Sequence, residues 1–208
     1  MNKYIFASGN ANKVKEVNEM IGKYHQVAAV ISLKDIGFSG DIEENGTTFL
    51  ENATIKAKAV KDFLNKTHTF QDFSILADDS GLCVDSLNGE PGIYSARYGG
   101  DHNIELNRKT LLKNLENKTD RSAHFFCSMV LIFPDGTLIS SEGKTFGEIL
   151  KEKTGDSGFC YDPYFYSFDL KKSFGLATDQ EKNSVSHRAR ALASLMQKEN
   201  EYYNGKRK

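Results

Sequence analysis

The sequence contains no tryptophan, only three cysteines among its 208 residues, and no apolar run that approaches the length of a membrane span. Cys83, Cys127 and Cys160 are widely spaced and form no C-x-x-C pair. This spacing argues against a zinc site or a redox motif. We therefore expect three reduced thiols in a cytoplasmic protein, with neither a secretory signal nor a contact with a membrane.

An excess of charge is also missing. The chain has 27 basic and 28 acidic residues, which gives a formal net charge of -1. Proteins that bind nucleic acids or membrane surfaces in general carry a basic excess, so we expect neither partner. If the ligand is strongly anionic, positive charge must be concentrated at one site or supplied by a metal ion.

What is present is typical of a soluble globular protein, with 39% hydrophobic and 26% charged residues. The length allows one large domain or two small lobes, and neither a repeat nor a long linker interrupts the chain. Helical and β-type hydrophobic patterns alternate irregularly, with a β-rich middle. This mixture predicts an α/β fold with a mixed sheet.

The hydrophobic periodicity predicts the following elements. Strands are expected at 4–7, 27–33, 73–77, 82–87, 122–133, 137–141 and 146–150. Helices are expected at about 12–24, at 48–64 with a capping box at Thr48 and Glu51, after Asn103, and at 184–199. The third strand is expected to end at Asp78-Asp79-Ser80-Gly81.

The first candidate site is Ser8-Gly9-Asn10-Ala11-Asn12-Lys13, where a strand gives way to a helix. Free backbone amides at a helix start bind anions, and the helix dipole assists them. Gly9 lets a phosphate approach the backbone, and Lys13 lies one turn into the helix. The alternative is an ordinary capped turn with a surface lysine.

The second candidate is the acidic pair Asp78-Asp79, just after an apolar strand. Adjacent carboxylates repel each other unless a cation or a proton lies between them, and such oxygen ligands suit Mg²⁺. Neighbours on an extended chain point in opposite directions, so one of the two can bind metal while the other braces the loop. Glu43 and Asp79 form a divalent-metal site if their loops converge. Otherwise these residues are solvated acidic turns.

Four further segments carry weaker signals. Lys56 and Lys58 lie two residues apart on a helix, so one can face the loops and the other water. The loop Gly158–Pro163 offers aromatic faces for a nucleobase, or anchors itself in the core. Ser186-His187-Arg188 offers two adjacent hydrogen-bond donors, and Glu90–Tyr98 offers a rigid wall with Arg97; both are otherwise ordinary surface segments.

Taken in order, six motifs resemble the inosine triphosphate pyrophosphatase family over nearly the whole chain. They are A-S-G-N-A-N-K, E-E-N-G-T-T-F-L-E-N-A, A-D-D-S-G-L, G-E-P-G-I-Y-S-A-R-Y, G-F-C-Y-D-P and S-H-R. The resemblance implies hydrolysis of ITP, dITP and XTP to the monophosphate and pyrophosphate. It also implies an elongated mixed sheet flanked by helices, a single domain over 1–208 with two lobes and a central cleft, and a homodimer.

The resemblance also implies residue roles. Asp79 is the proposed proton acceptor, and Glu43 and Asp79 hold Mg²⁺. Because Asp79 cannot serve fully as both ligand and base, Asp78 is a second candidate, and Lys13 and Lys56 assist as charge partners. The implied substrate-binding residues are Ser8, Gly9, Asn10, Ala11, Asn12, Lys13, Ser80, Arg97, Phe159, Cys160, Tyr161, Asp162, Lys182, His187 and Arg188.

Two departures from the family pattern concern substrate preference. Cys160 stands where many relatives have a glycine, and 173–177 lacks an acidic residue often seen before the K-x-x-x-S-H-R stretch. Two other functions stay open: a pyrophosphatase of similar fold acting on dTTP or UTP, and a non-catalytic nucleotide-binding protein.

Overall fold

The computed structural model describes residues 2–24 and 28–206. The chain divides into two compact units. Unit 1 comprises Met1–Asp79, Ser128–Glu142 and Ala191–Lys208, and unit 2 comprises Ser80–Cys127 and Gly143–Arg190. That the whole chain behaves as one domain stays a prediction.

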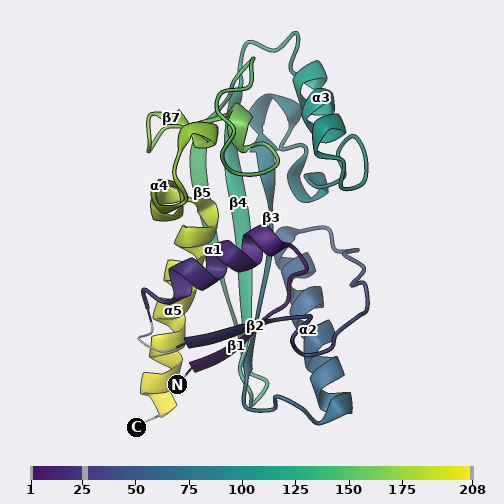
Figure 1. Ribbon diagram of the computed structural model, residues 1–208, viewed down its shortest axis with the longest axis vertical. Helices are drawn as coiled ribbons and strands as arrows, with labels where there is room; N and C mark the ends of the chain where they lie inside the picture. Colours follow the sequence, from purple (N-terminus) through teal and green to yellow (C-terminus); the bar gives the residue numbers. More distant parts are fainter. Residues whose placement is uncertain (1, 25–27, 207–208) are drawn as a thin grey trace. The chain divides into compact units, whose positions relative to one another are not determined.

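The fold is α/β with a mixed sheet, as the sequence predicted. The strands are β1 (Asn2–Phe6), β2 (Ala28–Ser32), β3 (Ser74–Val84), β4 (Ser122–Ile132), β5 (Leu138–Ile149), β6 (Phe165–Ser167) and β7 (Lys172–Ser173), in the order β2-β1-β3-β4-β5-β6-β7. β1 pairs in parallel with β2 and β3, whereas β5, β6 and β7 pair antiparallel. Figure 1 shows β1 and β2 side by side.

Five α-helices are labelled in Figure 1: α1 (Ala11–Ile21), α2 (Phe49–Thr67), α3 (Ile104–Asn114), α4 (Asp179–Val185) and α5 (His187–Lys206). α2 and α3 begin where Thr48 and Asn103 predict, and Asn10 of the candidate phosphate loop caps α1. Asn10, Thr48 and Asn103 each accept a hydrogen bond from a backbone amide of the first turn. Glu51, however, accepts from the amide of Thr47 rather than of Thr48, so the predicted capping box is only half formed.

Unit 1 buries one face of α2 against alternate residues of β1 and β3. Ala53, Ala57, Val60 and Leu64 pack with residues of odd number on the strands, namely Ile5, Ala7, Ile75 and Ala77. Because side chains alternate along a strand, Asp79 continues the face that α2 covers, and Asp78 belongs to the opposite face. The core thus fixes which way each carboxylate of the acidic pair points.

The core of unit 2 is largely aromatic. Phe125 of β4, Phe165 of β6 and Phe174 pack on one another, with ring centroids 4.7 and 5.1 Å apart for the pairs Phe125–Phe165 and Phe165–Phe174. Tyr161, Leu82 and Leu111 belong to the same buried cluster. The tip of the predicted base loop is therefore anchored in the core, through Tyr161.

Several predicted boundaries are wrong. The strand expected at 82–87 ends at Val84, because Asp85–Leu87 form a 3₁₀ helix. β3 continues through Asp78-Asp79-Ser80-Gly81 instead of ending there, because the two carboxylates find partners on opposite faces. β5 is one strand rather than two, since Gly143 and Gly147 remain extended within it. The last helix is two helices, because the extended Ser186 ends α4 and its hydroxyl accepts from the amide of Ala189.

Candidate functional site

In unit 1 the predicted phosphate loop connects β1 to α1. Asn10 caps the helix: its Oδ1 accepts from the amides of Asn12 and Lys13 at 3.0 and 3.3 Å, and the Ser8 hydroxyl accepts from the amide of Asn10. Three of the amides in the loop, those of Asn10, Asn12 and Lys13, are therefore bound by side chains of the loop itself. Gly9 and Asn10 are exposed, and a Cβ at Gly9 would meet no atom within 4 Å, so a ligand can approach there.

Lys13 reaches the first residue of the acidic pair. Its Nζ lies 3.2 Å from Oδ1 of Asp78, whose side chain is fully buried. A buried charge is stable only when it is paired, so this contact explains how Asp78 is tolerated inside β3. It also joins the first turn of α1, at the end of the predicted phosphate loop, to β3.

Lys56 lies beside Asp79, the second residue of the acidic pair. Its Nζ lies 3.0 Å from Oε2 of Glu44 and 3.8 Å from Oδ1 of Asp79. Lys58, two residues on, is exposed, as the spacing predicted. The structure thus brings Glu44, rather than Glu43, to the ammonium group of Lys56, and the side chain of Glu43 is exposed.

Asn52 is a contributor that the sequence reasoning missed. Its Nδ2 donates to Oδ2 of Asp79 at 3.0 Å, and its Oδ1 accepts from the amide of Gly46 at 2.9 Å. The buried Asn52 thus joins the end of the loop that carries Glu43 and Glu44 to Asp79, the proposed proton acceptor. The available signal was its position one turn before Lys56, where a polar residue lies on the same helix face.

The electrostatics single out Asp79 within this group. Burial raises the pKa of its carboxyl group above the ordinary value of 3.8, and Glu44 raises it further, while Lys56, Lys13 and Asn52 oppose the rise. A desolvated carboxylate beside a second carboxylate suits a hard divalent cation. Within residues 2–24 and 28–206, however, no three His, Cys, Asp or Glu side chains are placed together to hold a metal.

In unit 2 the start of α5 is held from two directions. Nη2 of the buried Arg188 donates to the hydroxyl of Ser80 at 2.8 Å. The His187 ring stacks on Phe125 with centroids 5.0 Å apart and an angle of 16°. The aromatic core of unit 2 therefore fixes the position of His187, and Ser80 of β3 fixes that of Arg188.

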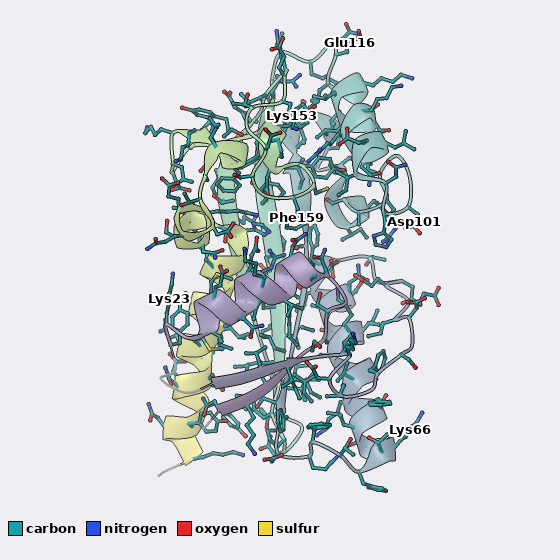
Figure 2. All side chains as sticks on the ribbon, viewed as in Figure 1. Lys23, Lys66, Asp101, Glu116, Lys153 and Phe159 are labelled. Atoms are coloured by element: carbon teal, nitrogen blue, oxygen red, sulfur yellow. The ribbon has the colours of Figure 1, made fainter. Side chains whose placement is uncertain are left out.

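The predicted base loop has its own internal network. Oδ2 of the buried Asp162 accepts from the amide of Phe159 and from Nζ of Lys182, each at 2.8 Å. The same ammonium group lies 5.0 Å from the centroid of the Phe159 ring, which Figure 2 labels. A Cβ at Gly158 would lie 2.3 Å from Asp162 Oδ2, so the loop requires glycine there.

The remaining predicted residues differ in their surroundings. The hydroxyl of Tyr161 donates to the carbonyl of Ser95 at 2.9 Å, which joins the base loop to the Glu90–Tyr98 segment. Arg97 is exposed, and its guanidinium lies 5.1 Å from the Tyr94 ring. The structure thus brings Tyr161 to the segment of Arg97, while Arg97 itself lies over the Tyr94 ring.

The sequence is similar to those of known proteins over nearly its whole length. A profile of the Ham1 family matches residues 4–198. The chain belongs to the Ham1 family. Among its relatives, a dITP/XTP pyrophosphatase of Clostridium perfringens is 46% identical over 94% of this chain and 96% of its own length. One of Treponema denticola is 43% identical over 93% and 96%.

Solved structures of Ham1 proteins have the same fold as this chain. The Ham1 protein of Staphylococcus aureus superposes with a TM-score of 0.81 at 36% identity, covering 99% of this chain and 100% of that one. A Ham1 protein from Coxiella burnetii gives 0.82 at 34% identity over 97% and 100%. Both the α/β fold and the family resemblance seen in the motifs are thereby confirmed. No helix in the described part of this Ham1 chain has the length and apolar character to span a bilayer.

Proposed function

We propose that this chain hydrolyses non-standard purine nucleoside triphosphates such as dITP, XTP and ITP, releasing the monophosphate and pyrophosphate. The observation that carries the proposal is the match over almost the whole chain to relatives named dITP/XTP pyrophosphatase. It is supported by the buried Asp79, whose carboxylate lies among Lys56, Asn52 and Glu44.

The acidic pair fits a magnesium ion by its chemistry, and Asp79 with the Glu43-Glu44 loop would hold it. A bound Mg²⁺ would offset substrate charge and lower the pKa of a bound water. Lys13 and Lys56 would stabilise the charge that develops on the leaving pyrophosphate. Asp78, buried and paired with Lys13, is the alternative proton acceptor to Asp79.

The base is proposed to lie against the Phe159 loop and the start of α5. His187 and Arg188 offer donors that would pair with the 6-keto oxygen of hypoxanthine or xanthine. The same donors would face the 6-amino donor of adenine. An unpaired buried donor costs about 1–3 kcal/mol, so each such contact disfavours ATP by about tenfold to a hundredfold.

The test is pyrophosphate release from dITP, XTP, ITP, GTP, ATP and dTTP, with Mg²⁺ and with EDTA. We expect a higher kcat/KM for dITP, XTP and ITP than for ATP and dTTP, and no release in EDTA. Equal values for ITP and ATP would contradict the proposed base recognition. Nucleotide binding without any release of pyrophosphate would instead favour a non-catalytic binding protein.

A soluble homodimer in the cytoplasm completes the proposal. The family resemblance supports the dimer, and the three free cysteines support the cytoplasm. Sedimentation of the purified chain tests the dimer directly, and a mass of one chain at micromolar concentration would contradict it.

A further inference from the structure

Arg108 of α3 contacts the loop that the proposed function assigns to the base, although no motif singled it out. Its Nε donates to the main-chain carbonyl of Cys160 at 2.5 Å. Its Nη1 donates to Oε1 of Glu105 at 2.7 Å, and its guanidinium lies 5.9 Å from the Tyr164 ring. The side chain is 12% exposed, so the guanidinium is held between the helix and the loop.

The carbonyl that Arg108 binds belongs to a strained residue. Cys160 has a φ of 50°, in the left-handed region that side chains other than glycine rarely adopt. Gly158, two residues earlier, is also left-handed, with a φ of 74°. Such a turn persists only when its surroundings hold it, and a charged donor is among the stronger ways to fix a carbonyl.

The loop has further anchors, Lys182 among them, but none of those described above donates to the Cys160 carbonyl. Asp162 binds the Phe159 amide at one side, and the Tyr161 hydroxyl binds the Ser95 carbonyl at the other. Between them, the peptide after Cys160 is oriented by Nε of Arg108. Loss of that bond would leave the left-handed turn free to relax, and with it the ring of Phe159.

We propose that Arg108 is a positioning residue for substrate specificity: it fixes the left-handed turn at Cys160 and thereby the orientation of Phe159 toward the base. This inference rests on the proposed function for its substrate, whereas its structural step does not. Arg108 itself touches neither the acidic pair nor the predicted phosphate loop through the contacts given above, so its effect is on binding of the base rather than on the chemical step.

The test uses Arg108→Met, which keeps most of the side-chain volume and removes the donors. Arg121→Met is the matched control, because Nε of Arg121 also donates to a main-chain carbonyl, that of Ile149 at 2.5 Å, in the same unit. We expect Arg108→Met to raise KM for ITP about tenfold with kcat within about threefold. Arg121→Met is expected to lower stability and leave both parameters within about twofold.

A double-mutant cycle makes the test specific. Glycine adopts φ near 50° without strain, so in Cys160→Gly the turn depends less on Arg108. We expect the rise in KM caused by Arg108→Met to shrink to about threefold or less in that background. An unchanged KM in Arg108→Met, an equal rise in Arg121→Met, or a full tenfold rise in the Cys160→Gly background would each overturn the proposal.

Amide hydrogen exchange without nucleotide separates this inference from the proposed function. Arg108→Met should speed exchange of the amides at 159–162 about tenfold, while Arg121→Met leaves them unchanged. If the wild-type chain fails to hydrolyse ITP, the proposed function fails and the exchange data still decide whether Arg108 fixes the loop. Unchanged exchange in Arg108→Met would refute the positioning role itself.

Discussion

At the scale of single residues, the fold makes the thiol of Cys160 unreactive. Burial, with the nearby carboxylate of Asp162, raises the pKa of its thiol to about 12. Because the thiolate is the reactive form, the thiol is a poor nucleophile at neutral pH. What Cys160 contributes is therefore its volume and its strained backbone rather than reactivity.

Replacing Cys160 tests that view. We expect Cys160→Gly to be at least as stable as the wild type and more stable than Cys160→Ala by about 1 kcal/mol, because glycine alone removes the left-handed strain. Urea unfolding of the three proteins measures the order. An alanine variant as stable as the glycine variant would show that the backbone at this position is not strained.

Asp79→Asn addresses the proton acceptor. We expect kcat for ITP to fall by about a hundredfold or more while the fold is retained, because the amide cannot accept a proton. Turnover is measured at saturating substrate and Mg²⁺, with near-ultraviolet circular dichroism as the control for folding. Near-normal turnover would remove Asp79 from the mechanism and favour Asp78.

The same variant has a signature in the pH dependence of stability. The pKa of Asp79 is raised by burial above its ordinary value of 3.8. Its contribution to stability is thus fully present below pH 3.8 and is lost as the pH rises through the folded-state pKa. The stability of Asp79→Asn relative to the wild type should increase from about pH 4 to about pH 8. A constant difference over that range would contradict the shift.

At the scale of elements, α2 separates two lysines by function. Lys56 is buried between Glu44 and Asp79, and Lys58 is exposed on another face of the same helix. A spacing of two residues turns the helix by about 200°, so the contrast follows from helical geometry. One helix therefore supplies both a test residue and its control.

We expect Lys56→Met to lower kcat/KM for ITP by about a hundredfold, since it removes charge stabilisation and leaves two carboxylates close together. Lys58→Met should keep kcat/KM within about twofold. Initial rates with ITP measure both. Similar losses in the two variants would indicate a general effect of helix charge instead.

The starts of α2 and α3 were predictable because Thr48 and Asn103 are local capping residues, whereas the starts of α4 and α5 were not predicted. The strand ends were not, because whether Asp78-Asp79 or Gly143 interrupts a strand depends on partners distant in the sequence. The same limit applied to the site: the sequence analysis singled out Asp79 and Lys56, whereas the roles of Asn52 and Arg108 rest on contacts that only the folded chain provides.

At the scale of the whole molecule, the near-zero net charge coexists with buried charges that are locally paired. Lys13, Lys56 and Lys182 each lie within 4 Å of a carboxylate. These lysines therefore lie beside particular carboxylates, in a chain that has no excess of basic residues. Because each of these ammonium groups is paired with a carboxylate, the expectation that positive charge is concentrated for an anionic ligand stays a prediction.

A long-range bond between β1 and α5 contributes to unit 1. The hydroxyl of Tyr4 lies 2.8 and 2.9 Å from the two carboxylate oxygens of the buried Glu199. We expect Tyr4→Phe to lower the free energy of unfolding by about 1–3 kcal/mol, because it takes a donor from a buried charge. Tyr24→Phe, at a tyrosine 43% exposed, is the control for urea unfolding. Equal stability of Tyr4→Phe and the wild type would contradict this role.

The interleaving of the two units has a consequence for biosynthesis. Every passage of the chain from one unit to the other lies inside a strand or helix: within β3, β4, β5 and α5. Unit 1 includes both β1 and the residues from Ala191 onward, so it cannot close while the ribosome still holds α5. β1 and β2 must therefore wait for the synthesis of α5 before unit 1 is complete, and a chain truncated before Ala191 would lack part of unit 1.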